Sequence, residues 1–175
     1  MYDWEINMNY LIRKSKIEDY DSIAHIVTKC WQNTYKNIVN NDFLDNLSKN
    51  EKARAKSQKE SFDKNNNHEY VLLINKKIVG FVKVCLSEEK IDDCGEIQAI
   101  YILKEYNGYG YGRKLFEKAV NELKSMGCKC MVIGCLDGNP SNEFYKHMGG
   151  EYLKQRIFSL PNQELHENVY YFENI

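Results

Sequence analysis

Three alternating glycines stand between a predicted strand and a predicted helix, and this turn constrains the fold more than any other feature of the chain. The stretch runs Asn107-Gly108-Tyr109-Gly110-Tyr111-Gly112-Arg113. Glycine adopts positive φ at little steric cost and lets a ligand approach the backbone closely. The N–H groups and the dipole at the start of a helix favour a phosphate or pyrophosphate, and Arg113 would add positive charge. An ordinary strand-to-helix turn remains the alternative interpretation.

Two common phosphate-binding motifs do not fit this turn. A Walker loop requires Gly-Lys-Ser/Thr at its end, but the sixth position counted from Gly108 is Arg113. A dinucleotide fingerprint requires a glycine at its last position, but counting from Gly110 places Leu115 there. An anion site at this turn would therefore belong to a different fold.

Hydrophobic periodicity around the turn predicts a mixed α/β chain. The expected order is strand, two helices, three strands, helix, strand, helix and two strands. The expected strands are Tyr10–Arg13, Tyr70–Ile74, Ile78–Leu86, Glu96–Leu103, Cys130–Leu136, Tyr152–Leu160 and Leu165–Phe172. The expected helices lie around Ile23–Trp31, from Phe43 into the polar stretch Lys49–Lys64, over Leu115–Leu123, and from Asn139-Pro140 to Gly149-Gly150. A turn at Asn75-Lys76-Lys77 would join two strands as a hairpin.

The length and the net charge of the chain limit the classes of protein to which it can belong. With 175 residues, 43% of them hydrophobic, the chain suits one domain over 1–175 with a core of its own. The formal net charge of -1 gives no basic surplus of the kind that nucleic-acid binders show, so we expect no nucleic-acid partner. No apolar run approaches the roughly 20 residues that span a bilayer, so we expect no membrane span.

The cysteines indicate a reducing compartment. The six thiols form no C-x-x-C pair, and Cys128 and Cys130 have a spacing unlike the usual zinc ligands. Most lie in apolar runs, where a reduced thiol behaves as a small hydrophobe. The segment Met1–Lys14 has no apolar core of a signal peptide. We therefore expect a cytoplasmic protein without a metal.

Two blocks of sequence resemble the GNAT superfamily of N-acetyltransferases. Glu96-Ile97-Gln98-Ala99-Ile100-Tyr101-Ile102 resembles the family's coenzyme strand, and Asn107–Gly112 resembles its [QR]-x-x-G-x-[GA] loop, with Asn107 in place of Gln or Arg. Asn139-Pro140 through Phe144-Tyr145 to Gly149 matches the pattern N-P-x-x-x-F-Y-x-x-x-G. The resemblance is strong over Glu96–Gly150 and weaker elsewhere.

This resemblance implies a strongly bent, mostly antiparallel sheet, flanked by helices, whose two central parallel strands splay apart. Acetyl-CoA would lie in the cleft, with its pantetheine arm bound like an added strand and its pyrophosphate at the glycine turn. The coenzyme-binding residues that the resemblance implies are Ile100, Tyr101, Ile102, Asn107, Gly108, Tyr109, Gly110, Tyr111, Gly112, Arg113, Asn139, Asn142 and Tyr145.

The resemblance also implies catalytic roles. An alkylammonium has a pKa near 10.4, so a base must remove or relay a proton before attack. Glu96 is the candidate, directly or through water; a solvent-facing glutamate is the alternative. Tyr145 would act as general acid or orienter at the sulfur, or else serve as a buried structural tyrosine. Backbone N–H groups near Ile100 would hold the oxyanion.

The resemblance further implies that the amine acceptor binds near Trp31 and Tyr35, unless these side chains only pack in the core. Glu164 and Glu167 would attract a cationic amine or form a solvated edge. Cys135, near Asp137, has no histidine close in sequence and is expected to be a buried thiol rather than a nucleophile. His147 is expected at the surface.

The sequence thus predicts an N-acetyltransferase that moves an acetyl group from acetyl-CoA to a primary amine in a ternary complex. The acceptor stays open between a small amine, a polyamine, an aminoglycoside-like compound and a protein amino group. Transfer of a larger acyl group and a non-catalytic acyl-CoA-binding module or sensor are the alternatives. A homodimer is a further possibility.

Overall fold

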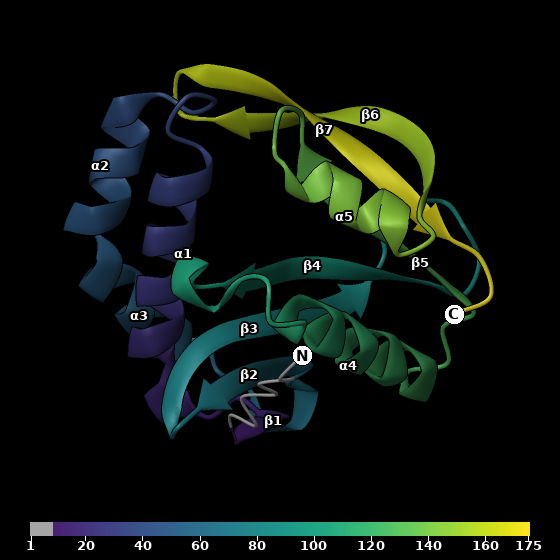
Figure 1. Ribbon diagram of the computed structural model, residues 1–175, viewed down its shortest axis with the longest axis horizontal. Helices are drawn as coiled ribbons and strands as arrows, with labels where there is room; N and C mark the ends of the chain where they lie inside the picture. Colours follow the sequence, from purple (N-terminus) through teal and green to yellow (C-terminus); the bar gives the residue numbers. More distant parts are fainter. Residues whose placement is uncertain (1–8) are drawn as a thin grey trace, which may run out of the picture.

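A computed structural model describes residues 9–175 of the chain. The first eight residues, on which the expected absence of a signal peptide partly rests, lie outside the described residues. The described strands form one seven-stranded sheet in the order β1-β2-β3-β4-β5-β7-β6 (Figure 1). Their bounds are β1 Tyr10–Lys14, β2 Glu69–Ile74, β3 Lys77–Leu86, β4 Cys94–Ile102, β5 Cys130–Leu136, β6 Glu151–Leu160 and β7 Gln163–Phe172.

The described helices lie on both sides of this sheet. They are α1 Tyr20–Thr34, α2 Asn41–Lys49, α3 Glu51–Glu60, α4 Tyr111–Ser125 and α5 Ser141–His147. Figure 1 shows α1, α2 and α3 together on one side, with α4 and α5 on the other. Both α1 and α4 pack on β3 and β4, and α5 packs on β5 and β7. The mixed α/β class is confirmed, and so is the predicted element order, except that three helices rather than two lie between β1 and β2.

One predicted helix is two helices in the structure. The expected stretch from Phe43 toward Lys64 breaks at Asn50, whose φ of -100° and ψ of 10° are not helical and whose N–H closes α2 onto Asn46. After this break, α3 turns onto α1. Arg54 of α3 donates to the Thr28 hydroxyl at 2.7 Å and so joins the two helices. The apolar spacing that defines the other helices is too sparse in this polar stretch to reveal the break.

The hairpin of β2 and β3 forms as predicted, with a tighter turn. Asn75 and Lys76 have φ values of 49° and 67°, the left-handed conformation that two-residue hairpin turns require. Lys77 therefore belongs to β3 rather than to the turn. Most residues of β2 are buried, including Val71 and Leu72, since β2 lies between β1 and β3 and the helices α1 and α4 pack on β3.

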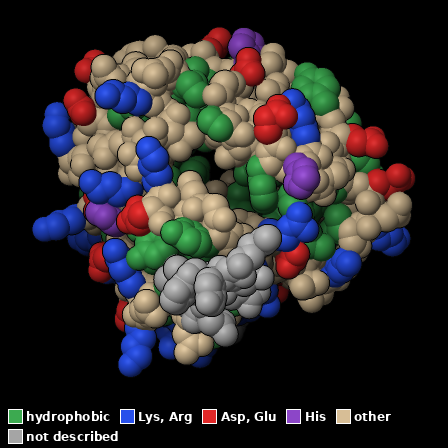
Figure 2. Space-filling view, viewed as in Figure 1, with side chains coloured by type: hydrophobic (Ala, Val, Ile, Leu, Met, Phe, Trp, Pro, Cys, Tyr) green, Lys and Arg blue, Asp and Glu red, His purple; other side chains and the backbone are tan. Residues whose placement is uncertain are grey.

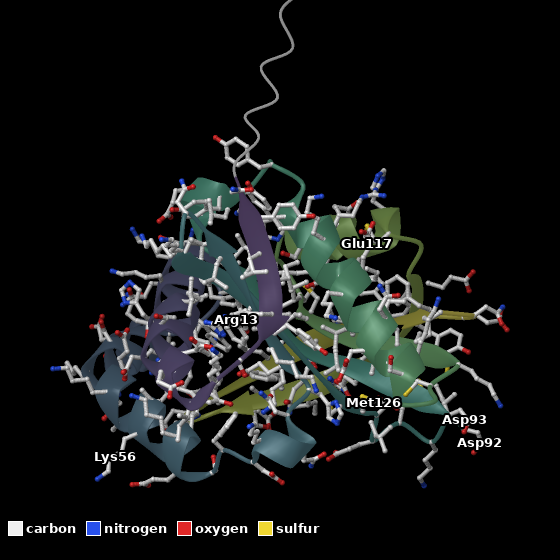
Figure 3. All side chains as sticks on the ribbon, turned by 90° about the horizontal axis from the view of Figure 1, so that it is seen from below. Arg13, Lys56, Asp92, Asp93, Glu117 and Met126 are labelled. Atoms are coloured by element: carbon white, nitrogen blue, oxygen red, sulfur yellow. The ribbon has the colours of Figure 1, made fainter. Side chains whose placement is uncertain are left out.

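The edge strand β1 lies beside α4, as the view from below shows (Figure 3). The ring of Tyr10 packs edge-on against Tyr111 with centroids 6.0 Å apart, and the ammonium of Lys114 lies 4.7 Å from the centre of the Tyr10 ring. Arg13, labelled in Figure 3, donates two hydrogen bonds to Asp19, at 2.6 and 3.0 Å. These contacts join the first strand to α4 and to the start of α1.

The pair β4 and β5, the one parallel pair of the described sheet, parts partway along its length. Pairing runs from Cys94 opposite Cys130 to Ile97 opposite Ile133. Beyond these residues β4 continues with β3 as far as Ile102, and β5 continues with β7. The bent, mostly antiparallel sheet with two splayed central parallel strands is therefore confirmed.

A buried amide fastens α5 to the strands on its side of the opening. Asn142, which is 8% exposed, donates from Nδ2 to the carbonyls of Leu136 and Asn139 at 2.9 and 2.7 Å. Its Oδ1 accepts from the Tyr170 hydroxyl at 2.8 Å and from Asn168 at 3.2 Å. Both ends of the amide are thus occupied inside the protein, and α5 is fixed on β5 and β7.

No helix among residues 9–175 is long and apolar enough to cross a membrane.

Replacing Asn142 with alanine tests this fastening. The change leaves the buried Tyr170 hydroxyl without its acceptor and removes one of the donors to the carbonyls of Leu136 and Asn139, so we expect the free energy of unfolding to fall by about 2–3 kcal/mol. The measurement is urea unfolding followed by circular dichroism. Asn121→Ala, at an exposed position on α4, is the matched control and should change stability by less than about 0.5 kcal/mol. Equal effects of the two changes would contradict the role of the buried network.

Candidate active site

A cavity of about 680 Å³ lies where β4 and β5 part. Its walls come from α1, β4, the glycine turn, β5, α5 and the closing hairpin of β6 and β7. Figure 2 shows this face of the molecule hollowed near its centre, with hydrophobic side chains at the hollow. The splay of the two strands therefore produces an accessible cavity and not only a gap in the sheet.

The β4 side of the cavity offers backbone groups. The N–H of Leu103 donates to the Val79 carbonyl on β3 at 2.9 Å. Because successive residues of a strand direct their peptide groups to opposite edges, those of Ile100 and Ile102 face the open edge, away from β3. The Ile102 carbonyl accepts from the Cys30 thiol of α1 at 3.3 Å, as this direction requires. Ile100, Tyr101 and Ile102, all expected at the coenzyme, line the cavity.

A bulge lies next to this open edge. The pairing of β3 with β4 passes from Lys83–Ala99 to Val84–Ile97, so Gln98 has no partner opposite it. An extra residue of this kind bends a strand and redirects its backbone groups. Gln98 lines the cavity at the point where β4 leaves β5.

The glycine turn presents N–H groups at the mouth of the cavity. Gly108 and Gly110 have φ values of 86° and 79°, and α4 begins directly afterwards at Tyr111. Within the described part of the chain, no acceptor receives the N–H groups of residues 108–113. Asn107, Gly108, Gly110, Gly112 and Arg113 line the cavity. These N–H groups and the start of α4 form a surface suited to an anion.

Two tyrosines of the turn direct their side chains elsewhere. Tyr109 is 54% exposed and Tyr111 is buried in the core, and neither lines the cavity. Both were expected among the coenzyme-binding residues, and the structure leaves only their backbone groups for that purpose. Their rings pack against one another, with centroids 6.3 Å apart.

Tyr145 of α5 lies on the cavity wall. Its side chain is 6% exposed, and its hydroxyl makes no hydrogen bond to a residue within 9–175. Burial raises the pKa of Tyr145 well above its ordinary value, and the nearby groups of Cys135, Tyr35 and Tyr101 raise it further. The phenol is therefore protonated at neutral pH and free to donate into the cavity.

The two asparagines of the Asn-Pro block have internal roles. Asn139 lines the cavity, but its Nδ2 donates to the Tyr35 hydroxyl at 2.8 Å and its Oδ1 accepts from the Ser141 N–H. Asn142, expected at the coenzyme, does not line the cavity because its amide is engaged with β5 and β7. For Asn142 the structure corrects the expectation.

Aromatic side chains surround one end of the cavity. Trp31 and Tyr35 of α1 both line it, with ring centroids 4.7 Å apart, and Phe158 of β6 lies against Trp31. The Trp31 indole N–H donates to the Tyr101 hydroxyl at 3.0 Å. Burial raises the pKa of Tyr101 to about 12, so this hydroxyl is also protonated. The two side chains expected at the acceptor are thus brought together at one wall.

Glu96, expected as the base, does not line the cavity. Its Oε1 accepts a hydrogen bond from Arg156 of β6 at 2.7 Å, and its side chain lies in a cluster of charges. Strand alternation explains this position, because Glu96 and the buried Ile97 point to opposite faces of β4. The carboxylate that does line the cavity is Glu167 of β7, whereas Glu164 is exposed at the end of the hairpin.

Two other residues lie as the sequence predicts. His147 is exposed, and Cys135 is buried on the cavity wall, where burial raises the pKa of its thiol to about 12. A thiol of this kind forms little thiolate at neutral pH and is a poor nucleophile. In the described part of the chain, no group of three or more His, Cys, Asp or Glu side chains is placed to hold a metal ion.

Sequence reasoning missed Gly134 and Phe158 and left Glu167 undecided. All three line the cavity. An isolated glycine in an apolar strand indicates a close approach by another group, and Gly134 within Cys130–Leu136 carried that signal. No local pattern marked Phe158, because its position depends on how the last hairpin folds over α1.

Comparison with known proteins agrees with this geometry. A family model described as the Acetyltransferase (GNAT) family matches residues 21–149. An uncharacterized N-acetyltransferase, YuaI, of Bacillus subtilis (strain 168) is 29% identical over 159 residues, which cover 89% of this chain and 88% of that protein. A spermidine N(1)-acetyltransferase of Thermoplasma acidophilum is 22% identical over 123 residues, covering 69% of this chain and 74% of that protein.

A solved structure shares the fold. It is the PaiA N-acetyltransferase of Thermoplasma acidophilum in complex with coenzyme A, with a TM-score of 0.69 and 16% identity, covering 92% of this chain and 98% of that one. The family model spans the splayed strands, the glycine turn and the Asn-Pro block, which together build the cavity. The chain therefore belongs to the GNAT family of acetyltransferases.

Proposed function

We propose that this protein transfers an acetyl group from acetyl-CoA to a primary amine by direct attack in a ternary complex. The observation that carries the proposal is the open edge of β4, with its peptide groups beside a cavity that also holds the Tyr145 hydroxyl. An extended pantetheine arm would pair with Ile100 and Ile102 as an added strand does. This pairing would bring the thioester to the centre of the cavity.

The glycine turn supports a place for the coenzyme's pyrophosphate. The N–H groups of residues 108–113 point to an anion site, and the backbone at Gly108 and Gly110 allows close approach. Arg113 would add charge at the same wall. Asn107, where the family pattern has Gln or Arg, reaches less far, so the backbone contributes most of the affinity.

The chemistry would use few groups. The backbone near Ile100 would stabilise the oxyanion as the amine attacks the thioester carbonyl. Tyr145 would then supply a proton to the departing sulfur, since its phenol is protonated and has no other partner within the described residues. Water would take the proton that the amine nitrogen loses and return one to the Tyr145 phenolate. Direct attack by the amine, rather than a thioester on Cys135, is supported by the raised pKa of that thiol. Glu96 would act only indirectly, by accepting a hydrogen bond from Arg156, and would not contact the acceptor.

The acceptor would enter from the aromatic end, past Trp31 and Tyr35.

A broad amine panel, with coenzyme A release followed by a thiol reagent, tests the proposed function directly. Release with primary amines and acetyl-CoA is the expected result. Binding of acetyl-CoA without release across the panel would favour an acyl-CoA sensor, and faster release from longer acyl-CoA esters would favour a larger acyl group. The cytoplasmic location and the homodimer stay predictions.

Gly110→Ala tests the anion site. Alanine is strained at a φ of 79°, and its methyl group would enter the space that the pyrophosphate needs, so we expect the Kd for coenzyme A to rise about tenfold or more in calorimetry. Gly127→Ala is a matched control, because Gly127 has a φ of 88° but lies at the far end of α4. It should lower stability to a similar extent and leave the Kd within about twofold. Equal Kd values for the two variants would argue against the site.

Tyr145→Phe tests the acid. Removal of the hydroxyl should lower kcat about 100-fold, the lower end of what a general acid contributes, with an unchanged Kd for coenzyme A. Steady-state rates with the best amine of the panel provide the measurement. A rate within about twofold of the wild-type value would show that Tyr145 is only structural.

A further inference from the structure

Three carboxylates gather around one arginine behind the cavity. Arg156 donates from Nε to Glu167 Oε2 at 2.6 Å and from Nη2 to Glu96 Oε1 at 2.7 Å, and its Nη1 lies 3.6 Å from Glu89. Lys154 adds a second cation, which bonds Glu89 at 2.6 Å. Three carboxylates thus face two cations, which leaves one negative charge without a partner inside the cluster.

Glu167 alone among these three carboxylates lines the cavity. Its Oε2 is held by Arg156, whereas its Oε1 accepts no hydrogen bond from the described residues and is not sealed from solvent. Its side chain is nevertheless only 13% exposed. The arginine therefore fixes the carboxylate on one side and leaves an acceptor oxygen on the other.

The fold makes room for this carboxylate at the point where the strands part. A Cβ atom built on Gly134 would overlap the Glu167 carboxyl carbon and both oxygens. Gly134 follows Ile133, the last residue of β5 that pairs with β4. The carboxylate thus lies against the backbone of Gly134 at the point where the two strands separate. Any residue larger than glycine at this position would displace it.

Protonated hydroxyls and aromatic faces lie at the same wall. Burial is the largest cause that raises the pKa of Tyr35, Tyr101 and Cys135, and the negative charge of Glu167 raises it further. These three groups therefore lie close enough to Glu167 to interact with its charge. The rings of Trp31 and Phe158 complete the enclosure. A carboxylate oxygen among aromatic faces is the arrangement that binds an alkylammonium ion.

Resting on the proposed function, we propose that Glu167 binds the acceptor and selects a cationic primary alkylamine, with Arg156 and Gly134 positioning its carboxylate. The ammonium group lies against Oε1 and its alkyl chain against the rings. An alkylamine has an ordinary pKa of about 10.4, so the acceptor reaches the site as its ammonium ion. Glu167 therefore orients the amine, and the proton leaves through water. Amines that are neutral at the assay pH, such as arylamines, lack this interaction.

The test separates binding from turnover. Coenzyme A-saturated protein is titrated with N,N-dimethylbutylamine, a cation that keeps one N–H but forms no stable amide, and KM is measured with butylamine, putrescine and spermidine. Glu167→Gln should raise the Kd of the probe and the KM of the amines about 10- to 100-fold, the loss expected for a charge-assisted hydrogen bond. The Kd for coenzyme A should stay within about twofold, which also shows that the variant is folded.

Three further variants complete the design. Glu164→Gln removes the same charge from an exposed position on β7 and should change neither constant by more than about twofold. Gly134→Ala keeps the charge but displaces the carboxylate, and should raise both constants as Glu167→Gln does. The inference is overturned if Glu167→Gln behaves like Glu164→Gln, if Glu96→Gln raises KM instead, or if wild-type protein binds coenzyme A but not the probe. A wild-type protein that binds the probe but never acetylates an amine would refute the proposed function alone.

Discussion

The parting of β4 and β5 is the constraint on which the rest of the structure depends. Beyond Ile97 and Ile133, β4 stays paired with β3 and β5 stays paired with β7, but β4 and β5 no longer pair with each other. Peptide groups inside a protein are costly unless they find a hydrogen-bond partner. The inner edge of β4 therefore favours an extended polar ligand, and the cavity of about 680 Å³ gives such a ligand access to that edge. A ligand with an amide-rich arm and an anionic end would satisfy both the strand edge and the glycine turn.

The two sides of the opening are held by separate sets of contacts. On the β4 side, α1 and α4 pack on β3 and β4, and the Cys30 thiol reaches the edge of the strand itself. On the β5 side, Asn142 ties α5 to the strand ends, and Arg156 holds Glu167 against Gly134. A few contacts, such as those of Arg156 with Glu96 and of Asn139 with Tyr35, also join the two sides, and the two walls of the cavity provide different chemistry. The β4 wall offers backbone polarity, and the opposite wall offers a hydroxyl and a carboxylate.

Apart from one helix break, hydrophobic periodicity predicted the order of the elements. The splay and part of the cavity wall were implied by the resemblance of the glycine turn and the Asn-Pro block to the GNAT family. The sequence did not predict the break at Asn50, where a polar helix carries no apolar spacing to mark its end. Nor did it predict that Asn142 turns inward or that Glu96 lies behind Arg156, because both depend on partners from β6 and β7 that lie far away in the chain. The isolated Gly134 was the one local sign that a side chain from another strand would approach β5.

Amide hydrogen exchange measured by NMR, with and without coenzyme A, tests the central claim most directly. If the coenzyme lies between the splayed strands, the N–H groups of Ile100, Ile102 and residues 108–113 should exchange at least about tenfold more slowly when it is bound, because they then donate hydrogen bonds. The amides of β1 should be unaffected. Slower exchange elsewhere with no change at these positions, or no change at any amide, would contradict the account.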